Sequence, residues 1–293
     1  MLRLLAAAKL NLYLRVVGRR HDGYHEIETL FERVDLADEI TLTLRPKGIV
    51  VSCDDPTLDC GPENLVTKAA VLLQRTYGIT QGAAIHIAKR IPIASGLGGG
   101  SSDAATVLLG LNQLWNIGCS TQQLAGLARQ LGSDAPFFIT ESPFAIGRGR
   151  GDLCEPLMDK TPTLWHVLVV PPERLSTQTI YQGFDERKAP NSTLTGVWPS
   201  ITMTLHALCN GSLGELAKGL YNELEPEAIR RCPILTEIQS RLHEGGCVGV
   251  LTSGSGPAVF GLCHDAAHAK AVAHQLREGS PAELRVYVVS TFR

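Results

Sequence analysis

The sequence has no Cys-x-x-Cys pair, no surplus of positive charge and no long uninterrupted apolar run. Its eight cysteines are scattered along 293 residues, which fits neither a small disulfide-linked domain nor a zinc ribbon and is typical of reduced cytosolic thiols. Lys and Arg number 27 against 29 for Asp and Glu, so no excess of cations can neutralise a nucleic-acid backbone or an anionic membrane. We therefore expect neither nucleic acid nor membrane as a partner.

No stretch has the pattern of a targeting or membrane segment. The uncharged run at residues 4–8 is shorter than the ~7 to 15 residues of a signal-peptide core. Longer uncharged stretches, at residues 104–128, 189–214 and 245–264, are interrupted by Asn, Gln, Ser, Pro or Gly. These features predict a cytoplasmic protein, and no obligate protein partner is evident from them.

What is present is the composition of an ordinary globular protein, with 44% hydrophobic and 19% charged residues. At ~100 to 200 residues per domain the length favours two domains, which we place at residues 1–158 and 159–293. Hydrophobic periodicity predicts strands at residues 10–14, 40–44, 84–89, 161–171, 248–251, 258–262 and 284–289. It predicts helices at residues 64–77, 104–115, 121–131, 205–221, 234–243 and 266–277, and residues 186–200 have the pattern of a loop.

The richest local signal is the segment 92–105, Pro-Ile-Ala-Ser-Gly-Leu-Gly-Gly-Gly-Ser-Ser-Asp-Ala-Ala, between a predicted strand and a predicted helix. Glycines let backbone N–H groups converge without Cβ obstruction, and a helix N-terminus adds partial positive charge, so the segment predicts a phosphate site. Ser101 or Ser102 is the expected N-cap, with Asp103 in the first turn. The alternative is a flexible connector, which seldom opens a well-patterned helix.

Two other nucleotide motifs do not fit this segment. A P-loop requires a lysine directly after its last glycine, and none stands here. A dinucleotide fold would place an acidic residue ~20 positions after the glycines, but no Asp or Glu occurs between Asp103 and Asp134.

Four blocks of the sequence resemble the GHMP kinases, the superfamily of galacto-, homoserine, mevalonate and phosphomevalonate kinases. They are Ala-Lys-Leu-Asn-Leu at 8–12 with Gly-Arg-Arg-His-Asp-Gly-Tyr-His at 18–25, the glycine-rich segment 96–105, Leu-Gly-Ser-Asp-Ala-Pro-Phe-Phe at 131–138, and Thr-Ser-Gly-Ser-Gly-Pro-Ala-Val-Phe at 252–260. Within the superfamily they are most similar to the branch whose substrate carries a cytidine diphosphate group. Ala7 replaces the family's usual proline, and Ala94 and Ser95 stand where two glycines are common, which puts the loop geometry in question.

The resemblance implies an α+β fold of two domains, with the active site in the cleft between them. The N-terminal domain would resemble a small-subunit ribosomal-protein fold and bind ATP, and the C-terminal domain would be ferredoxin-like. ATP would be the co-substrate, with Mg²⁺ on its phosphates, and the acceptor would be a hydroxyl of a small molecule that carries a cytidine diphosphate group.

Lys9 and Asp134 are the candidate catalytic pair. A carboxylate near the substrate alcohol can accept its proton, and a neighbouring ammonium keeps that carboxylate ionised while it stabilises the transition state. The resemblance implies the same roles. The alternatives are a helix cap or surface acid for Asp134 and a solvated strand-edge lysine for Lys9.

Tyr24 and His25 are the candidate base-reading residues. An aromatic ring can stack on a nucleobase, and an imidazole can hydrogen-bond the polar edge of cytosine. The alternative is a packed turn after the Asp-Gly pair at 22–23. By resemblance, Tyr181 supplies the opposite stacking face and Asn11 a polar contact near the cytidine, although a tyrosine at helical spacing is more often a packing residue.

The resemblance also implies ATP contacts near the adenine and along the glycine-rich segment. The candidate ATP-binding residues are Asn64, Leu65, Lys89, Pro92, Ile93, Ala94, Ser95, Gly96, Leu97, Gly98, Gly99, Gly100, Ser101 and Ser102. Asn64 and Leu65 fit a helix start equally well. Residues 252–256 would place their backbone near the substrate's diphosphate or form a purely structural tight turn.

Two rival functions remain open at this point: a different small-molecule GHMP kinase, and a catalytically silent GHMP-fold sensor that regulates a partner. A sensor needs no base, so the presence of both Lys9 and Asp134 favours an enzyme. His264 and His268 have the i,i+4 step of a metal pair, but Asp265 replaces the glutamate of the His-Glu-x-x-His motif. We interpret these histidines as structural or surface residues, and the metal ligands stay unknown.

Overall fold

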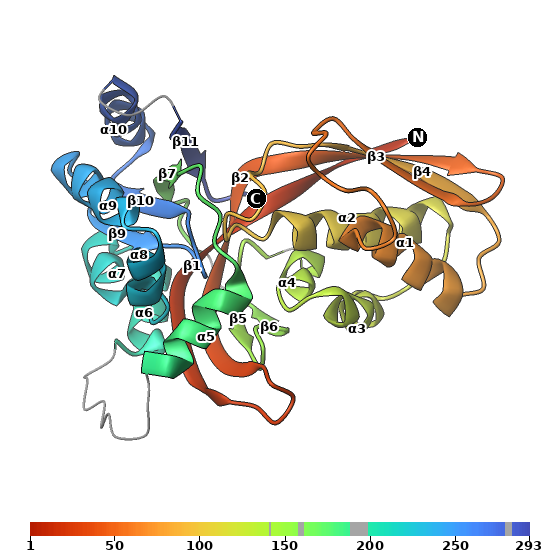
Figure 1. Cartoon of the computed structure of the whole chain (residues 1–293), viewed down its shortest axis with the longest axis horizontal. Coiled ribbons are helices and arrows are strands. Elements are labelled where there is room, and N and C mark those ends of the chain that lie inside the picture. Colours follow the sequence, from red (N-terminus) through yellow and green to blue (C-terminus); the bar gives the residue numbers. More distant parts are fainter. Residues whose placement is uncertain (141, 158–160, 188–198, 279–282) are drawn as a thin grey trace.

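Two β-sheets with helices packed against them organise the part of the chain that the structure describes (Figure 1). The computed structural model describes residues 1–140, 142–157, 161–187, 199–278 and 283–293. The expected mixture of α and β elements is confirmed. The domain boundary after residue 158 falls on residues 158–160, which lie outside the described residues, so it stays a prediction.

The first sheet is built on a long antiparallel hairpin, β1 (Leu2–Arg19) with β2 (His25–Arg45). β4 (Gly82–Ala88) joins β2, and β3 (Ile49–Cys53) runs parallel to β4. On the other half of β2, β5 (Phe144–Arg148) pairs with β2 and with β6 (Leu153–Pro156). A two-residue strand from the second half of the chain, β8 (Tyr221–Asn222), pairs parallel with β1 and so links the halves.

Four helices cover one face of this sheet: α1 (Leu65–Thr76), α2 (Gly99–Leu114), α3 (Thr121–Leu131) and α4 (Ala135–Ile139). Their apolar residues form one core with the sheet, in which Leu42 and Ile85 pack with Leu73, Leu108 and Phe137. Residues 102–108 of α2 are all buried, because this helix lies directly against the sheet and between its neighbours. The start of α2, where the glycine-rich segment ends, is therefore fixed in place.

The second sheet has the order β11-β7-β10-β9, with all pairs antiparallel. Its strands are β7 (Trp165–Val170), β9 (Gly249–Thr252), β10 (Val259–Cys263) and β11 (Arg285–Ser290). Successive residues face opposite sides, as strand geometry requires. Leu168 and Phe260 pack toward β1 of the first sheet, while Val167 and Val259 pack under the helices.

Six helices belong to this second half: α5 (Thr177–Arg187), α6 (Ile201–Cys209), α7 (Leu213–Gly219), α8 (Glu225–Arg231), α9 (Ile234–Glu244) and α10 (Ala266–Glu278). A buried polar contact also ties the two sheets together. Glu32 of β2 accepts from Thr291 at 2.7 Å and lies 2.9 Å from Nε2 of His166 on β7. Breaking such a fully buried contact would leave a carboxylate without partners, so it holds the two sheets in a fixed relation.

Most predicted elements are confirmed, although β1 and β2 extend far beyond the strands predicted at 10–14 and 40–44, and two predictions are wrong. The helix expected at 205–221 is two helices, because the chain turns at Gly211 with φ of 67° and then enters β8. The N-cap of α2 is Gly98 in the left-handed conformation, so Ser101 and Ser102 lie inside the helix. Of the loop expected at 186–200, residues 188–198 lie outside the described residues. Helices α4, α5 and α8 and strands β3, β5, β6 and β8 were not predicted.

Candidate active site

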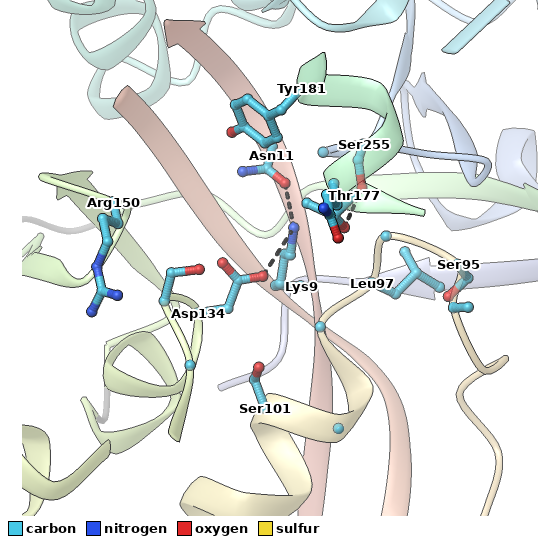
Figure 2. A pocket seen from close by; sticks show the side chains of 18 of the residues that line it. Lys9, Asn11, Ser95, Leu97, Ser101, Asp134, Arg150, Thr177, Tyr181 and Ser255 are labelled. Carbon is cyan, nitrogen blue, oxygen red and sulfur yellow. Dashed lines mark hydrogen bonds and ion pairs between the residues drawn. The ribbon is translucent and has the colours of Figure 1, made fainter. Parts of the chain in front are cut away.

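A cavity of about 910 Å³ lies where the two halves of the chain meet. The first half contributes the glycine-rich segment, Lys9, Asn11 and the turn at 22–25, and the second half contributes residues of α5 with Gly254 and Ser255. That the active site lies in this cavity stays a prediction. Figure 2 shows Lys9 near its centre, with Asp134, Ser101 and Tyr181 approaching from different elements.

The glycine-rich segment bends through three left-handed residues before α2 begins: Ala94 with φ of 56°, Gly96 with 82° and Gly98 with 72°. Ala94 thus adopts a conformation that glycine prefers, at one of the two positions where the sequence departs from the family pattern. The segment is fixed at both sides, because Lys9 N donates to Leu97 O and Ala258 N donates to Ser95 O. The first backbone N–H groups of α2 have no acceptor within the helix, so they are available to an anion in the cavity.

Lys9 and Asp134 form an ion pair with Nζ and Oδ2 3.6 Å apart. Lys9 is only 4% exposed, and its burial lowers the pKa from the ordinary value while the carboxylate of Asp134 opposes that fall. Asp134 stands at the N-cap position of α4, but its side chain makes no capping hydrogen bond and is 29% exposed. The cap and surface-lysine alternatives are therefore wrong in this structure, and the pair faces the cavity.

Asn11 fixes the ammonium of Lys9 from the other side. Its Oδ1 accepts from Lys9 Nζ at 2.5 Å, and its Nδ2 donates to Thr29 Oγ1 at 2.8 Å (Figure 2). The turn at 252–256 packs directly on this pair, since a Cβ on Gly254 would lie 3.1 Å from both Asn11 Oδ1 and Lys9 Nζ. Gly254 and Ser255 line the cavity, so the turn adjoins the site.

Tyr24 and His25 lie in the cavity wall together with Tyr181 of α5. The Arg150 guanidinium lies 4.7 Å from the centroid of the Tyr24 ring, a cation–π contact. The Tyr181 ring stacks on the His25 imidazole at 4.7 Å, and its burial raises the pKa of the phenol. The ring of Tyr181 thus has a protein partner in His25, and whether it also covers a base stays a prediction.

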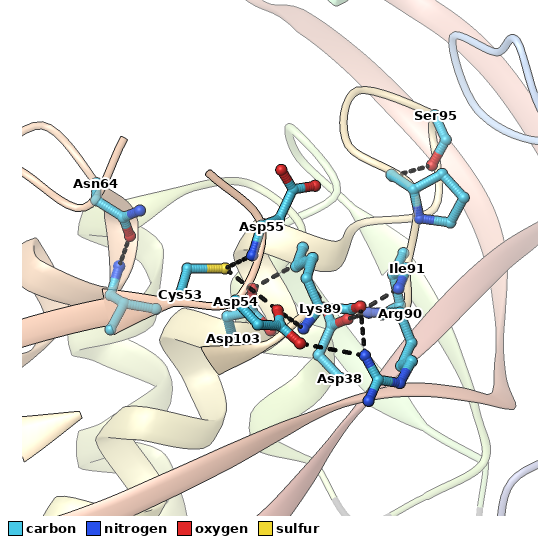
Figure 3. A network of polar contacts seen from close by, with 12 residues as sticks. Asp38, Cys53, Asp54, Asp55, Asn64, Lys89, Arg90, Ile91, Ser95 and Asp103 are labelled. Atoms are coloured by element: carbon cyan, nitrogen blue, oxygen red, sulfur yellow. Dashed lines mark hydrogen bonds and ion pairs between the residues drawn. The ribbon is translucent and has the colours of Figure 1, made fainter. Parts of the chain in front are cut away.

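Lys89 is held by two buried carboxylates, as Figure 3 shows. Its Nζ lies 2.5 Å from Asp38 Oδ2 and 2.7 Å from Asp103 Oδ2, and Asp38 also accepts from the backbone N–H groups that follow Lys89. Burial alone would lower the pKa of Lys89, but the two carboxylates raise it. Burial, together with nearby Asp38, raises the pKa of Asp103 to about 7 despite the attraction of Lys89. The lysine lines the cavity, but its charge is already neutralised by this cluster.

All but two of the predicted site residues line the cavity. Asn64 instead caps α1, where its Oδ1 accepts from Val66 N and its Nδ2 donates to Asp59 O. Ser102 is buried inside α2 and its hydroxyl has no partner among the described residues. Asn64 therefore starts helix α1, and whether Asn64 or Ser102 contacts ATP stays a prediction.

Sequence reasoning missed several residues of the cavity wall, among them Asp103, Arg150, Thr177 and Asp185. Asp185 lies 2.7 Å from His25 Nε2, and Thr177 lies 2.9 Å from Ser255 Oγ. Asp185 stands four residues after Tyr181, so recognising α5 as a helix would have placed both on one face. Arg150 has no comparable signal, because only the pairing of β5 and β6 brings it near Tyr24.

Two family models match this chain. The GHMP kinases N terminal domain matches residues 64–142, and the GHMP kinases C terminal matches residues 204–282. The first match includes the glycine-rich segment and Asp134, and the second includes the turn at 252–256. The chain therefore belongs to the GHMP kinases, a class of ATP-dependent small-molecule kinases.

Relatives that align with nearly the whole chain show to which branch of the superfamily it belongs. The 4-diphosphocytidyl-2-C-methyl-D-erythritol kinase of Pelotomaculum thermopropionicum is 40% identical over 98% of this chain and 97% of its own. That of Gloeobacter violaceus is 41% identical over 99% and 94%. A crystal structure of 4-(cytidine 5'-diphospho)-2C-methyl-D-erythritol kinase superposes with a TM-score of 0.81, at 38% identity over 99% of this chain and 98% of that one. Within the superfamily, this chain is a member of the 4-diphosphocytidyl-2-C-methyl-D-erythritol kinase family.

Proposed function

We propose that this chain transfers the γ-phosphoryl group of ATP to the 2-hydroxyl of 4-diphosphocytidyl-2-C-methyl-D-erythritol, with Lys9 and Asp134 as the catalytic pair. The observation that carries this assignment is their ion pair at 3.6 Å, facing a cavity that also contains the N-terminus of α2. Membership of the family supports the reaction and the substrate class, and the ion pair supports the proposed roles of Lys9 and Asp134.

In this mechanism the substrate's hydroxyl oxygen attacks the γ-phosphorus, the bond from that phosphorus to the bridging oxygen breaks, and ADP leaves. Asp134 accepts the hydroxyl proton as the new bond forms, and Lys9 stabilises negative charge on the attacking oxygen and the transferring group. The backbone N–H groups at the start of α2 hold the phosphates. Asn11 keeps the Lys9 ammonium directed at this point.

Mg²⁺ bound to the ATP phosphates would neutralise part of the charge that develops during transfer. Such an ion is held mainly by phosphate oxygens and water, with one or two protein oxygens. The residues present fit this requirement, because the Ser101 hydroxyl and the Asp134 carboxylate both line the cavity. The described residues contain no group of three or more His, Cys, Asp or Glu side chains that could hold a metal by themselves.

The substrate's base would lie at the Tyr24 and His25 end of the cavity, where aromatic and imidazole groups gather. ATP would lie along the glycine-rich segment, with its adenine toward Leu58, Leu65 and Lys89. No helix of the described residues is long and apolar enough to span a bilayer.

The decisive experiment is phosphate transfer from ATP measured against a panel of alcohols: the cytidyl erythritol, homoserine and mevalonate. Rapid turnover with the first substrate alone supports the proposal. A preference for homoserine or mevalonate would indicate a different GHMP kinase, and ligand binding with no transfer to any alcohol would indicate a sensor.

A further inference from the structure

The turn at 252–256 is held from outside the cavity by a buried side chain, that of Asn222 in β8. Its Nδ2 donates to Thr252 O and to Gly254 O, both at 2.7 Å, and its Oδ1 accepts from Leu224 N at 3.0 Å. Only 4% of Asn222 is exposed, and it is not among the described residues that line the cavity. Both amide hydrogens and the amide oxygen of Asn222 are thus bound within the protein.

Glu225, at the start of α8, holds the same turn through a backbone N–H. Its Oε1 accepts from Thr252 N at 2.8 Å and from Gln239 Nε2 at 2.6 Å. Thr252 therefore gives its carbonyl oxygen to Asn222 and its N–H to Glu225. These two side chains fix the backbone at the point where β9 ends and the turn begins.

The same segment is registered on the strand that carries Lys9. β8 pairs parallel with β1, and Asn222 stands opposite Leu14 in this pair. Glu223 N donates to Leu14 O at 2.9 Å, and Glu223 Oε2 accepts from Val16 N at 2.7 Å. The segment thus bridges β1 and the turn, so it sets where the turn lies relative to the strand.

Gly254 is the residue at which the turn meets the proposed catalytic pair. A Cβ on Gly254 would lie 3.1 Å from Lys9 Nζ and 3.1 Å from Asn11 Oδ1, so the backbone of the turn lies directly against the ammonium. The carbonyl of this same residue is one of the two that Asn222 holds. A shift of the turn would open space beside the ammonium and let it leave its position 3.6 Å from Asp134 Oδ2.

We infer that Asn222 is a positioning residue for phosphoryl transfer: it keeps the turn against the Lys9 ammonium and so fixes that ammonium beside Asp134. The role requires a carboxamide, because its NH₂ group supplies two donors for two carbonyl oxygens while its oxygen accepts from the backbone. Without these donors the two buried carbonyls would lose their partners, which the turn can avoid only by moving. This inference rests on the proposed function and adds to it the origin of the alignment of Lys9.

The kinetic test replaces Asn222 by Ala and measures phosphate transfer with both substrates varied. We expect kcat to fall by roughly 10- to 100-fold, the cost of misplacing a reacting group by up to about 1 Å, with KM for ATP and for the cytidyl substrate unchanged. A rise in KM for the cytidyl substrate at wild-type kcat would mean that the turn only binds substrate. That result, or wild-type kinetics, would overturn the inference.

Asn112→Ala is the matched control. Asn112 Nδ2 donates to Cys119 O at 3.1 Å and its Oδ1 accepts from Cys119 N at 2.8 Å, but Asn112 does not line the cavity. It should lower the melting temperature and keep wild-type kcat. Should Asn222→Ala fail to fold, Glu225→Gln carries the test, because it keeps the side-chain shape and weakens the hydrogen bond from Thr252 N. Its kcat should fall by less, and wild-type kcat would overturn the inference.

A double-variant cycle shows whether Asn222 acts through Lys9. In a Lys9→Met background, Asn222→Ala should lower kcat little further, because the ammonium that it positions is already absent. A merely structural role would lower kcat by the same factor in both backgrounds. Such equal factors would overturn the inference.

A further measurement reads the ammonium without turnover. In ¹³C-lysine NMR spectra, the Cε signal of Lys9, assigned with Lys9→Met, should shift in Asn222→Ala and keep its wild-type position in Asn112→Ala. A Lys9 signal that is the same in Asn222→Ala and in the wild type would overturn the inference. If the signal shifts as expected but the wild-type protein transfers no phosphate to the cytidyl substrate, the proposed function alone is refuted.

Discussion

Replacing Asp134 by Asn should abolish most turnover while leaving the fold intact. The carboxylate is 29% exposed and makes no capping bond, so its loss removes little that stabilises α4. In the active site it removes the proposed base, and general-base assistance is worth ~10² to 10⁴-fold, or about 2.7 to 5.4 kcal/mol of transition-state stabilisation. The substitution would also deprive Lys9 of the carboxylate that opposes the effect of burial, so the pKa of Lys9 should fall further.

The ion pair of Lys9 and Asp134 also leads to a prediction for a variant in which both residues are replaced. If Lys9 and Asp134 act as one unit, the combination of Lys9→Met with Asp134→Asn should lose little more kcat than the worse single variant. Independent roles would instead multiply the two losses. Met keeps the apolar stem of Lys9 beside Gly98, which limits disturbance of the loop, and removes only the ammonium that lies 5.7 Å from the centroid of the Phe31 ring.

The assay is steady-state phosphate transfer with both substrates varied, together with thermal unfolding of each variant. Asp265→Asn is a matched control, because this carboxylate accepts from His268 N at the start of α10, away from the cavity. It should keep wild-type kcat. Near-native kcat in Asp134→Asn would refute the assignment of Asp134 as the base. Multiplicative losses of kcat in the double variant would refute the hypothesis that Lys9 and Asp134 act as one unit.

Three further predictions follow from the cavity wall. Gly98→Ala should weaken ATP binding in calorimetry, because residue 98 has φ of 72° and its Cβ would lie 3.0 Å from Lys9 Cγ, whereas Gly126→Ala on α3 adds a Cβ with no described residue within 4 Å and should bind ATP normally. Tyr24→Ala should raise KM for the cytidyl substrate by roughly 5- to 150-fold and leave KM for ATP unchanged in steady-state kinetics, and equal changes in both would contradict base stacking. Asp103 holds its proton more tightly when folded, so its contribution to stability is full below its ordinary pKa of 3.8 and is lost as pH rises through about 7. The melting temperature of Asp103→Asn relative to wild type should therefore rise between about pH 4 and about pH 7, and a constant difference would show that Asp103 ionises normally.

The phosphate end of the site could be predicted from the sequence because its chemistry is local. Gly96 and Gly98 stand where the backbone must turn left-handed, and the apolar spacing after them marks a helix start. The prediction of a serine as the N-cap of α2 is nevertheless wrong. Serine is a favoured N-cap, but the left-handed turn ends at Gly98 and α2 begins at the next residue, so the serines are already helical.

The substrate end could be predicted only in part, because its geometry depends on contacts between residues far apart in the chain. His25 and Asp185 are 160 positions apart and meet only when α5 packs beside the β1–β2 hairpin. The environment of Lys89 also depends on residues from other elements of the fold. The resemblance places Lys89 among the candidate ATP-binding residues, whereas Asp38 and Asp103 arrive from β2 and α2 and neutralise its charge.

The position of the phosphate site depends on the second half of the chain as well as on the first. A Cβ on Gly96 would lie 2.6 Å from Ser253 O and 2.9 Å from Gly256 O, so the loop and the turn at 252–256 are in direct backbone contact. Ala258 N also donates to Ser95 O, and Asn11 N donates to Ser253 Oγ on the other side of Lys9. The turn therefore supports both the glycine-rich segment and the strand that carries Lys9. A displacement of the second sheet would move both together, so under the proposed function it would shift ATP and the reacting hydroxyl together.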